Sequence, residues 1–193
     1  MGNGKQLLFV AARYWRGARA VWVDVNRQDM MSEPTSYLLS MSVELALKSF
    51  LIDNGVNGDD LRKYKVRHNI AELLKMSVDR GFLISIDEAG DLCVLGLSHS
   101  DHFYRYGSEN VVGGEAKYLL VEEAALLLVA RIIDRVSGNP DVLRRVFLDQ
   151  DRYIDWPATP PVIGISAGQL QEINQKMKDE VAAAIVKFQS TQM

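Results

Sequence analysis

The apolar stretch 37–55 holds two residues able to do chemistry, Glu44 and Lys48. Glu44 precedes Lys48 by four positions, the order and spacing that pair opposite charges along a helix. The pair is either solvated and weakly stabilising, or desolvated at a groove or subunit interface. The apolar neighbours favour the desolvated alternative, in which breaking the pair costs about 3–5 kcal/mol.

His68 is a second candidate, because it opens a predicted helix directly after a basic run. That run contains Arg62, Lys63, Lys65 and Arg67. The favoured interpretation is a helix end beside a solvated basic loop. The alternative is a small anion or phosphate site, since a helix N-terminus with nearby cations attracts negative charge.

A third group of candidates follows at residues 99–106. His99, Asp101 and His102 resemble a metal motif, but with His68 as the only other histidine the ligand set is thin. We therefore predict no metal and no cofactor. Arg105 lies one helical turn beyond His102, and this pair could bind a phosphate, because arginine presents a fixed fork of donors.

The spacing of apolar residues predicts the elements that must position these groups. Helical periodicity predicts helices near 5–28, 32–54, 69–80, 117–136 and 166–189, with Asp87 capping another helix that carries His99, His102 and Tyr106. The short apolar run 82–86 has no partner strand and is not assigned as a strand. The predicted fold is an all-α, up-and-down bundle of four to five main helices.

The predicted domain organisation is a helical bundle over residues 1–139 followed by an extension over 140–193. The extension contains a short helix, an extended proline-rich connector and a C-terminal amphipathic helix, packed on the core or on a partner.

Composition narrows the function classes. The chain has 193 residues, 48% hydrophobic and 24% charged, and its net charge of −3 argues against a broad nucleic-acid-coating surface. The single cysteine, Cys93, forms no internal disulfide and is expected to fill the core. No apolar run is interpreted as a transmembrane segment, and a cytoplasmic location is expected.

Four segments together resemble the HEPN domains, which are small helical bundles. The matching segments are VELALKSFLIDNG, HNIAELLKMSVDRG, HFYRYGS and VEEAALLLVARIIDRV, within residues 5–137. The resemblance implies a homodimer in which Arg105 occupies the arginine position of the nuclease motif. That motif places a histidine shortly afterwards, but here Asn110 stands five residues on and no histidine follows. Asparagine cannot exchange a proton near neutral pH, so the resemblance implies binding without cleavage.

The expected function is therefore a non-catalytic binding module for a nucleotide, RNA or a protein partner such as a nucleotidyltransferase-like protein. The resemblance implies a role in a toxin–antitoxin or defence system. The expected ligand-binding residues are Glu44, Lys48, His68, Arg105, Tyr106 and Asn110. Two alternatives stay open: a metal-independent RNase that uses Arg105 and His102, and a purely structural oligomerisation protein.

Overall fold

The computed structural model describes residues 4–24, 32–100, 122–138 and 162–191. Within these ranges the chain is helical and has no strand, which confirms the all-α prediction and the rejection of a strand at 82–86. The elements are α1 (Gly4–Asp24), α2 (Ser32–Asp53), the 3₁₀ helix η2 (Asp60–Arg62), α3 (Ile70–Val78), α4 (Ile86–Ser100), α6 (Glu122–Ser137) and α8 (Ala167–Thr191).

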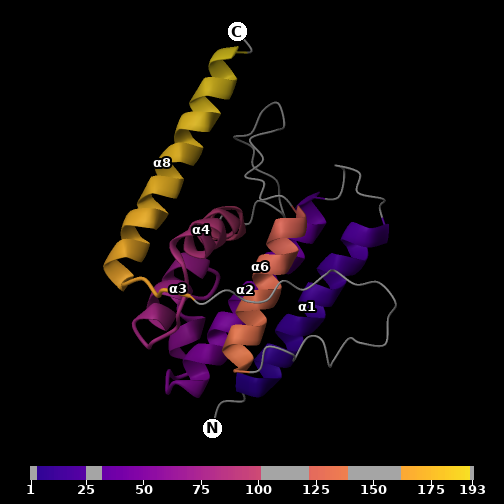
Figure 1. Ribbon diagram of the computed structural model, residues 1–193, viewed down its shortest axis with the longest axis vertical. Helices are drawn as coiled ribbons and strands as arrows, with labels where there is room; N and C mark the ends of the chain where they lie inside the picture. Colours follow the sequence, from indigo (N-terminus) through magenta and orange to yellow (C-terminus); the bar gives the residue numbers. More distant parts are fainter. Residues whose placement is uncertain (1–3, 25–31, 101–121, 139–161, 192–193) are drawn as a thin grey trace.

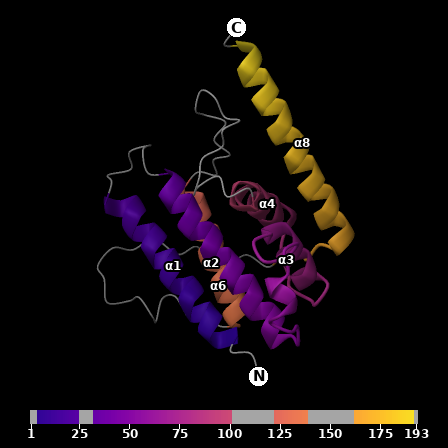
Figure 2. The ribbon, with the colours of Figure 1, turned by 180° about the vertical axis from the view of Figure 1, so that it is seen from behind.

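Helix α2 is the centre of the bundle. It packs against α1 and α6 on one side and against α3 and α4 on the other, and α8 lies outside α3 and α4 (Figures 1 and 2). Fully buried side chains from all of these layers form one core, whose largest members are Leu39, Leu47, Leu51, Ile70, Leu73, Leu74, Ile84, Leu92, Leu126, Leu128, Ile132 and Ile133. Any polar side chain that α2 directs inward is therefore removed from water.

The apolar character of α2 follows from this central place. Within the described residues, one segment, Pro34–Asp53, has the length and apolar composition that spanning a membrane would need. However, 56% of its most apolar window is buried inside the bundle. Burial against four neighbouring helices accounts for a helix that is apolar on nearly every side.

Several predicted helix ends are confirmed. Gly55 and Gly81 follow α2 and α3 with φ angles of 85° and 86°, a left-handed conformation that glycine adopts without steric cost. Asn69 caps α3, because its side chain accepts a hydrogen bond from the Glu72 amide at 3.1 Å. This cap fixes the entry into α3 one residue after His68.

The start of α4 differs from the prediction that Asp87 caps it. Ser85 is the capping residue, since its Oγ accepts from the Glu88 amide and its own amide donates to Glu88 Oε2, both at 3.2 Å. This reciprocal pair is a capping box, and Asp87 lies inside the first turn. The helix is described as far as Ser100, and the predicted continuation through His102 and Tyr106 lies outside the described residues.

Removing this cap provides a direct test of the helix start. We expect Ser85→Ala to lower the free energy of unfolding by about 1 kcal/mol, because the Glu88 amide loses its acceptor. Asp87→Ala should change it by less than about 0.5 kcal/mol, since Asp87 contributes only charge near the helix N-terminus. Urea denaturation followed by circular dichroism measures both values, and an Asp87 effect larger than the Ser85 effect would restore the predicted cap.

The predicted start of the last helix near residue 166 is confirmed, and Ser166 is its capping residue. Ser166 accepts from the Gln169 amide at 3.3 Å, and Gln169 Oε1 accepts from the Ser166 amide at 2.9 Å. The first half of α8 packs on α4 through the buried Leu170 and the half-buried Ile173 and Met177. The second half extends away from the other helices (Figures 1 and 2).

Candidate functional site

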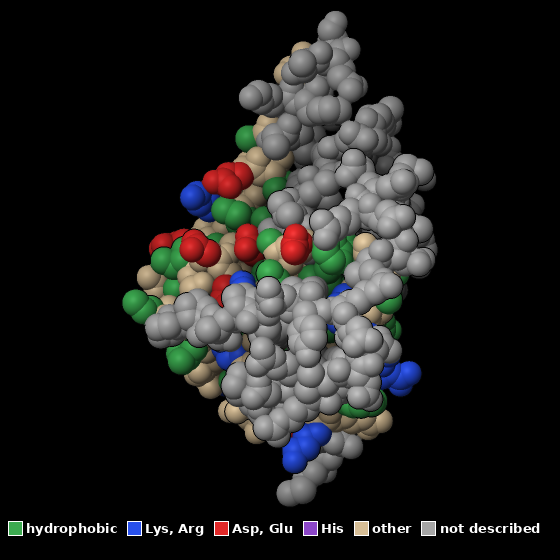
Figure 3. Space-filling view, turned by 45° about the vertical axis from the view of Figure 1, so that its right-hand side comes forward, with side chains coloured by type: hydrophobic (Ala, Val, Ile, Leu, Met, Phe, Trp, Pro, Cys, Tyr) green, Lys and Arg blue, Asp and Glu red, His purple; other side chains and the backbone are tan. Residues whose placement is uncertain are grey.

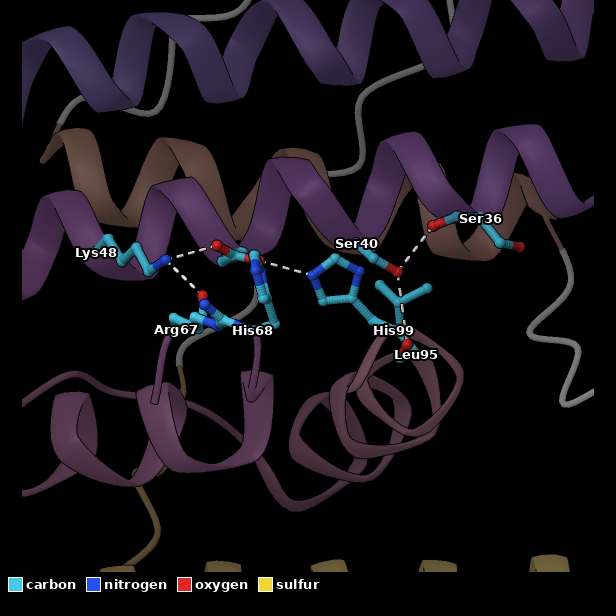
Figure 4. A network of polar contacts seen from close by, with 8 residues as sticks. Ser36, Ser40, Lys48, Arg67, His68, Leu95 and His99 are labelled. Carbon is cyan, nitrogen blue, oxygen red and sulfur yellow. Dashed lines mark hydrogen bonds and ion pairs between the residues drawn. The ribbon is translucent and has the colours of Figure 1, made fainter. Parts of the chain in front are cut away.

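Three polar side chains, those of Lys48, His68 and His99, contact the carboxylate of Glu44 in the space between α2, α3 and α4, and Figure 4 labels these three. The Oε1 atom of Glu44 accepts a hydrogen bond from Lys48 Nζ at 2.5 Å. Its Oε2 atom lies 2.6 Å from His99 Nε2 and 3.2 Å from His68 Nδ1. We call Glu44, Lys48, His68 and His99 the Glu44 cluster.

Three chain segments position the cluster. Glu44 and Lys48 stand one turn apart on α2, His68 lies in the turn before α3, and His99 belongs to the last turn of α4. Lys48 Nζ also donates to the main-chain carbonyl of Arg67 at 2.5 Å, which holds that turn against α2. The cluster is therefore a tertiary feature that forms only when α2, α3 and α4 are packed.

The carboxylate is charged although it is buried. Glu44 is 2% exposed and His99 is also buried, while the Lys48 side chain is 14% exposed. Burial raises the pKa of Glu44, but hydrogen bonds from His99 and Lys48, the charge of Lys48 and a further bond from His68 outweigh it and lower this pKa to about 2. The predicted ion pair thus exists, in its desolvated form.

The cluster reaches solvent on one side through His68, whose side chain is 31% exposed. The segment 62–67 that leads to His68 is mostly exposed, and Tyr64 within it is 86% exposed. The guanidinium carbon of Arg67 lies 5.5 Å from the centre of that ring. A buried polar centre is thereby continuous with an exposed aromatic and basic surface.

A second desolvated ion pair joins α4 to α6. Arg135 donates to both oxygens of Glu88 at 2.9 and 3.0 Å, and Arg131 Nε lies 3.5 Å from Glu88 Oε1. Burial raises the pKa of Glu88, and the bonds and charge of Arg135 outweigh this and lower it. The guanidinium of Arg135 and the carboxylate of Glu88 satisfy each other through two hydrogen bonds, so this pair connects α4 to α6. Glu88 stands in the first turn of α4, so the same carboxylate also lies at a helix N-terminus.

A cavity of about 250 Å³ lies between α3, α4 and α8. It is lined by Asn69, Ala71, Glu72, Lys75, Cys93, Gly96, Leu97, Leu170, Gln171, Asn174 and Lys178. Burial raises the pKa of the Cys93 thiol to about 11, so it stays protonated and unreactive near neutral pH. This agrees with the prediction that Cys93 fills the core.

The structure brings together three of the predicted ligand-binding residues: Glu44, Lys48 and His68. The others, Arg105, Tyr106 and Asn110, lie outside the described residues, as does the candidate His102.

The cluster member that sequence reasoning missed is His99, which was grouped with its neighbours Asp101 and His102. Its partner Glu44 is 55 residues away, and no local spacing signals that contact.

No protein-family model matches the chain, and neither the curated proteins nor the solved structures give a match. The resemblance to HEPN domains therefore depends on the quoted segments, and it stays a prediction.

Proposed function

We propose that the chain is a HEPN-like binding module that holds a nucleotide, either free or within single-stranded RNA, without cleaving it. The observation that carries the proposal is the exposed Tyr64–Arg67 pair beside the Glu44 cluster. An exposed aromatic ring offers a stacking surface to any base, and a neighbouring guanidinium adds a second planar surface and a charge for phosphate.

Local charge supports this site over other parts of the surface. Arg62 and Lys63 are paired with Asp59 and Asp60, which leaves Lys65 and Arg67 of the same run exposed and without an ion pair among the described residues. On the face in Figure 3, acidic side chains form a band among hydrophobic ones, and the described Lys and Arg side chains lie apart from each other. On this face, the described basic side chains therefore do not form a continuous phosphate-binding surface.

The sequence adds further groups to the proposal. The chain continues from His99, in the last turn of α4, to three further polar residues. These are His102, Arg105 and Asn110, which follow His99 by three, six and eleven positions. We include Arg105, Tyr106 and Asn110 in the proposed site, Arg105 for phosphate and Asn110 for hydrogen bonds to a base. A homodimer is part of the same proposal, with a partner such as a nucleotidyltransferase-like protein and a role in a toxin–antitoxin or defence system.

Binding of a fluorescently labelled single-stranded RNA, measured by anisotropy in EDTA, tests the function. We expect Tyr64→Ala to weaken binding about 5- to 150-fold, the range for loss of one stacked base. The affinity of the wild-type chain should also fall with rising salt, because phosphate binding releases counterions. ATP in excess should compete if a single nucleotide is enough.

The matched control is Phe9→Ala, because Phe9 is also exposed and has Arg13 6.0 Å from its ring, but it lies on α1. This variant should bind RNA like the wild-type chain. Equal weakening by Phe9→Ala and Tyr64→Ala, or no binding of RNA and ATP at all, would contradict the proposal. Shortened RNA on a denaturing gel would instead favour the RNase alternative.

A further inference from the structure

We propose that Glu44, His68 and His99 form a binding site for a divalent transition-metal ion of the zinc class. Each residue offers one ligand atom, and these three atoms lie within 4.8 Å of one another. Two imidazole nitrogens and one carboxylate oxygen are a ligand set that zinc and similar ions use when further coordination positions stay open.

The distances between the ligand atoms fit an ion at their centre. Zinc bonds of about 2.0–2.2 Å place tetrahedral ligand atoms roughly 3.3 Å apart. Glu44 Oε2 lies 3.2 Å from His68 Nδ1 and 2.6 Å from His99 Nε2. The second separation has to widen, and the ligand nitrogens of His68 and His99 lie within 4.8 Å of each other. On binding, His99 presents the Nε2 lone pair to the ion while its proton moves to Nδ1.

The surroundings support a metal ligand set in two ways. Lys48 donates to Oε1 of Glu44, which orients the carboxylate and leaves Oε2 for the ion, as neighbouring donors do in metal sites. Lys48 also neutralises Glu44, so a bound divalent ion would leave the site positively charged and open to water or an anion on the side of the half-exposed His68.

The ligand set spans three separate segments, and an ion would therefore fasten α2, the turn before α3 and the end of α4 together. This ligand set shares only His99 with the local motif of His99, Asp101 and His102, from which no metal is predicted. The proposed metal site does not depend on the binding of RNA at the neighbouring surface.

The test uses the full chain stripped with EDTA and dialysed, with Zn²⁺ and Co²⁺ as probes. We expect one Zn²⁺ per chain by calorimetry, a rise in melting temperature with Zn²⁺, and the visible absorption of nitrogen- and oxygen-bound Co²⁺. His68→Gln should weaken Zn²⁺ binding at least about tenfold and reduce the Co²⁺ band. His68 is half-exposed, so this variant is chosen over a change at the buried His99.

The matched control is His102→Gln, which removes a histidine of the local motif and should leave Zn²⁺ binding unchanged. The proposal is overturned if His68→Gln binds Zn²⁺ as tightly as the wild-type chain, or if the wild-type chain takes up no Zn²⁺. A His102→Gln chain that loses binding while His68→Gln keeps it would assign the ion to the local motif. Should His68→Gln fail to fold by circular dichroism, the wild-type Co²⁺ spectrum and Zn²⁺ stoichiometry decide.

Discussion

Glu44→Gln should lower the free energy of unfolding by about 3 kcal/mol in metal-free buffer at neutral pH. The substitution leaves the ammonium group of Lys48 largely buried without its counter-charge and weakens the hydrogen bonds to His68 and His99. In a chain of 193 residues, this loss corresponds to a fall in melting temperature of roughly 6–12 °C. Urea and thermal denaturation measure the two quantities.

The matched control for this prediction is Glu180→Gln. Glu180 pairs with Lys176 at the same four-residue spacing on α8, but both side chains are exposed and the atoms are 3.6 Å apart. This substitution should cost less than about 0.5 kcal/mol. If the two variants lose equal stability, the burial of the Glu44 pair has no energetic consequence and the prediction fails.

The effect of Glu44→Gln should also depend on pH. The pKa of Glu44 is lowered from 4.5 to about 2 in the folded chain, so the stability that its charge provides is fully present above pH 4.5 and is lost as the pH falls towards 2. The difference in stability between wild-type and variant chains should therefore shrink over this interval. Comparing the two chains removes the contribution of Glu88, whose pKa is lowered in both. A difference that stays constant down to pH 2 would contradict the lowered pKa.

Local features of this fold are predictable from sequence because their geometry is set within one helix. Ala11, Trp15 and Ala18 are buried as their spacing on α1 predicts, and Glu44 meets Lys48 because four residues make one turn. The Ser85–Glu88 capping box is also a local signature, three residues apart. The structure has this box in place of the predicted Asp87 cap.

Features that depend on how helices pack could not be predicted in this way. The spacing in 117–136 predicts Ala124 and Leu127 on the inner face, but α6 has Ala124 exposed and Leu127 only half-buried. The helix contacts both α1 and α2, so its buried face is broader than one stripe and includes Leu126 and Val129. The contact of His99 with Glu44 has the same origin, since it exists only when α4 lies across α2.

Trp15→Ala should be among the most destabilising single substitutions in the described part of the chain, with a loss of about 3–5 kcal/mol. Trp15 is 2% exposed, and its Nε1 donates to the main-chain carbonyl of Leu126 at 2.8 Å, which ties α1 to α6 across 111 residues of sequence. Truncation leaves a cavity and an unsatisfied contact between the two helices, and neither can be repaired without moving α1.

Two companion variants separate the contributions of the hydrogen bond and of burial to this loss of stability. Trp15→Phe keeps most of the apolar volume and removes the donor, so it should cost about 1–2 kcal/mol. Phe9→Ala removes an aromatic ring from the exposed face of the same helix and should cost less than about 1 kcal/mol. Urea denaturation followed by far-ultraviolet circular dichroism gives all three values without depending on tryptophan fluorescence. A loss for Trp15→Ala no larger than that for Phe9→Ala would mean that this side chain does not hold α1 on α6, and that α1 is held in the bundle mainly by its contacts with α2.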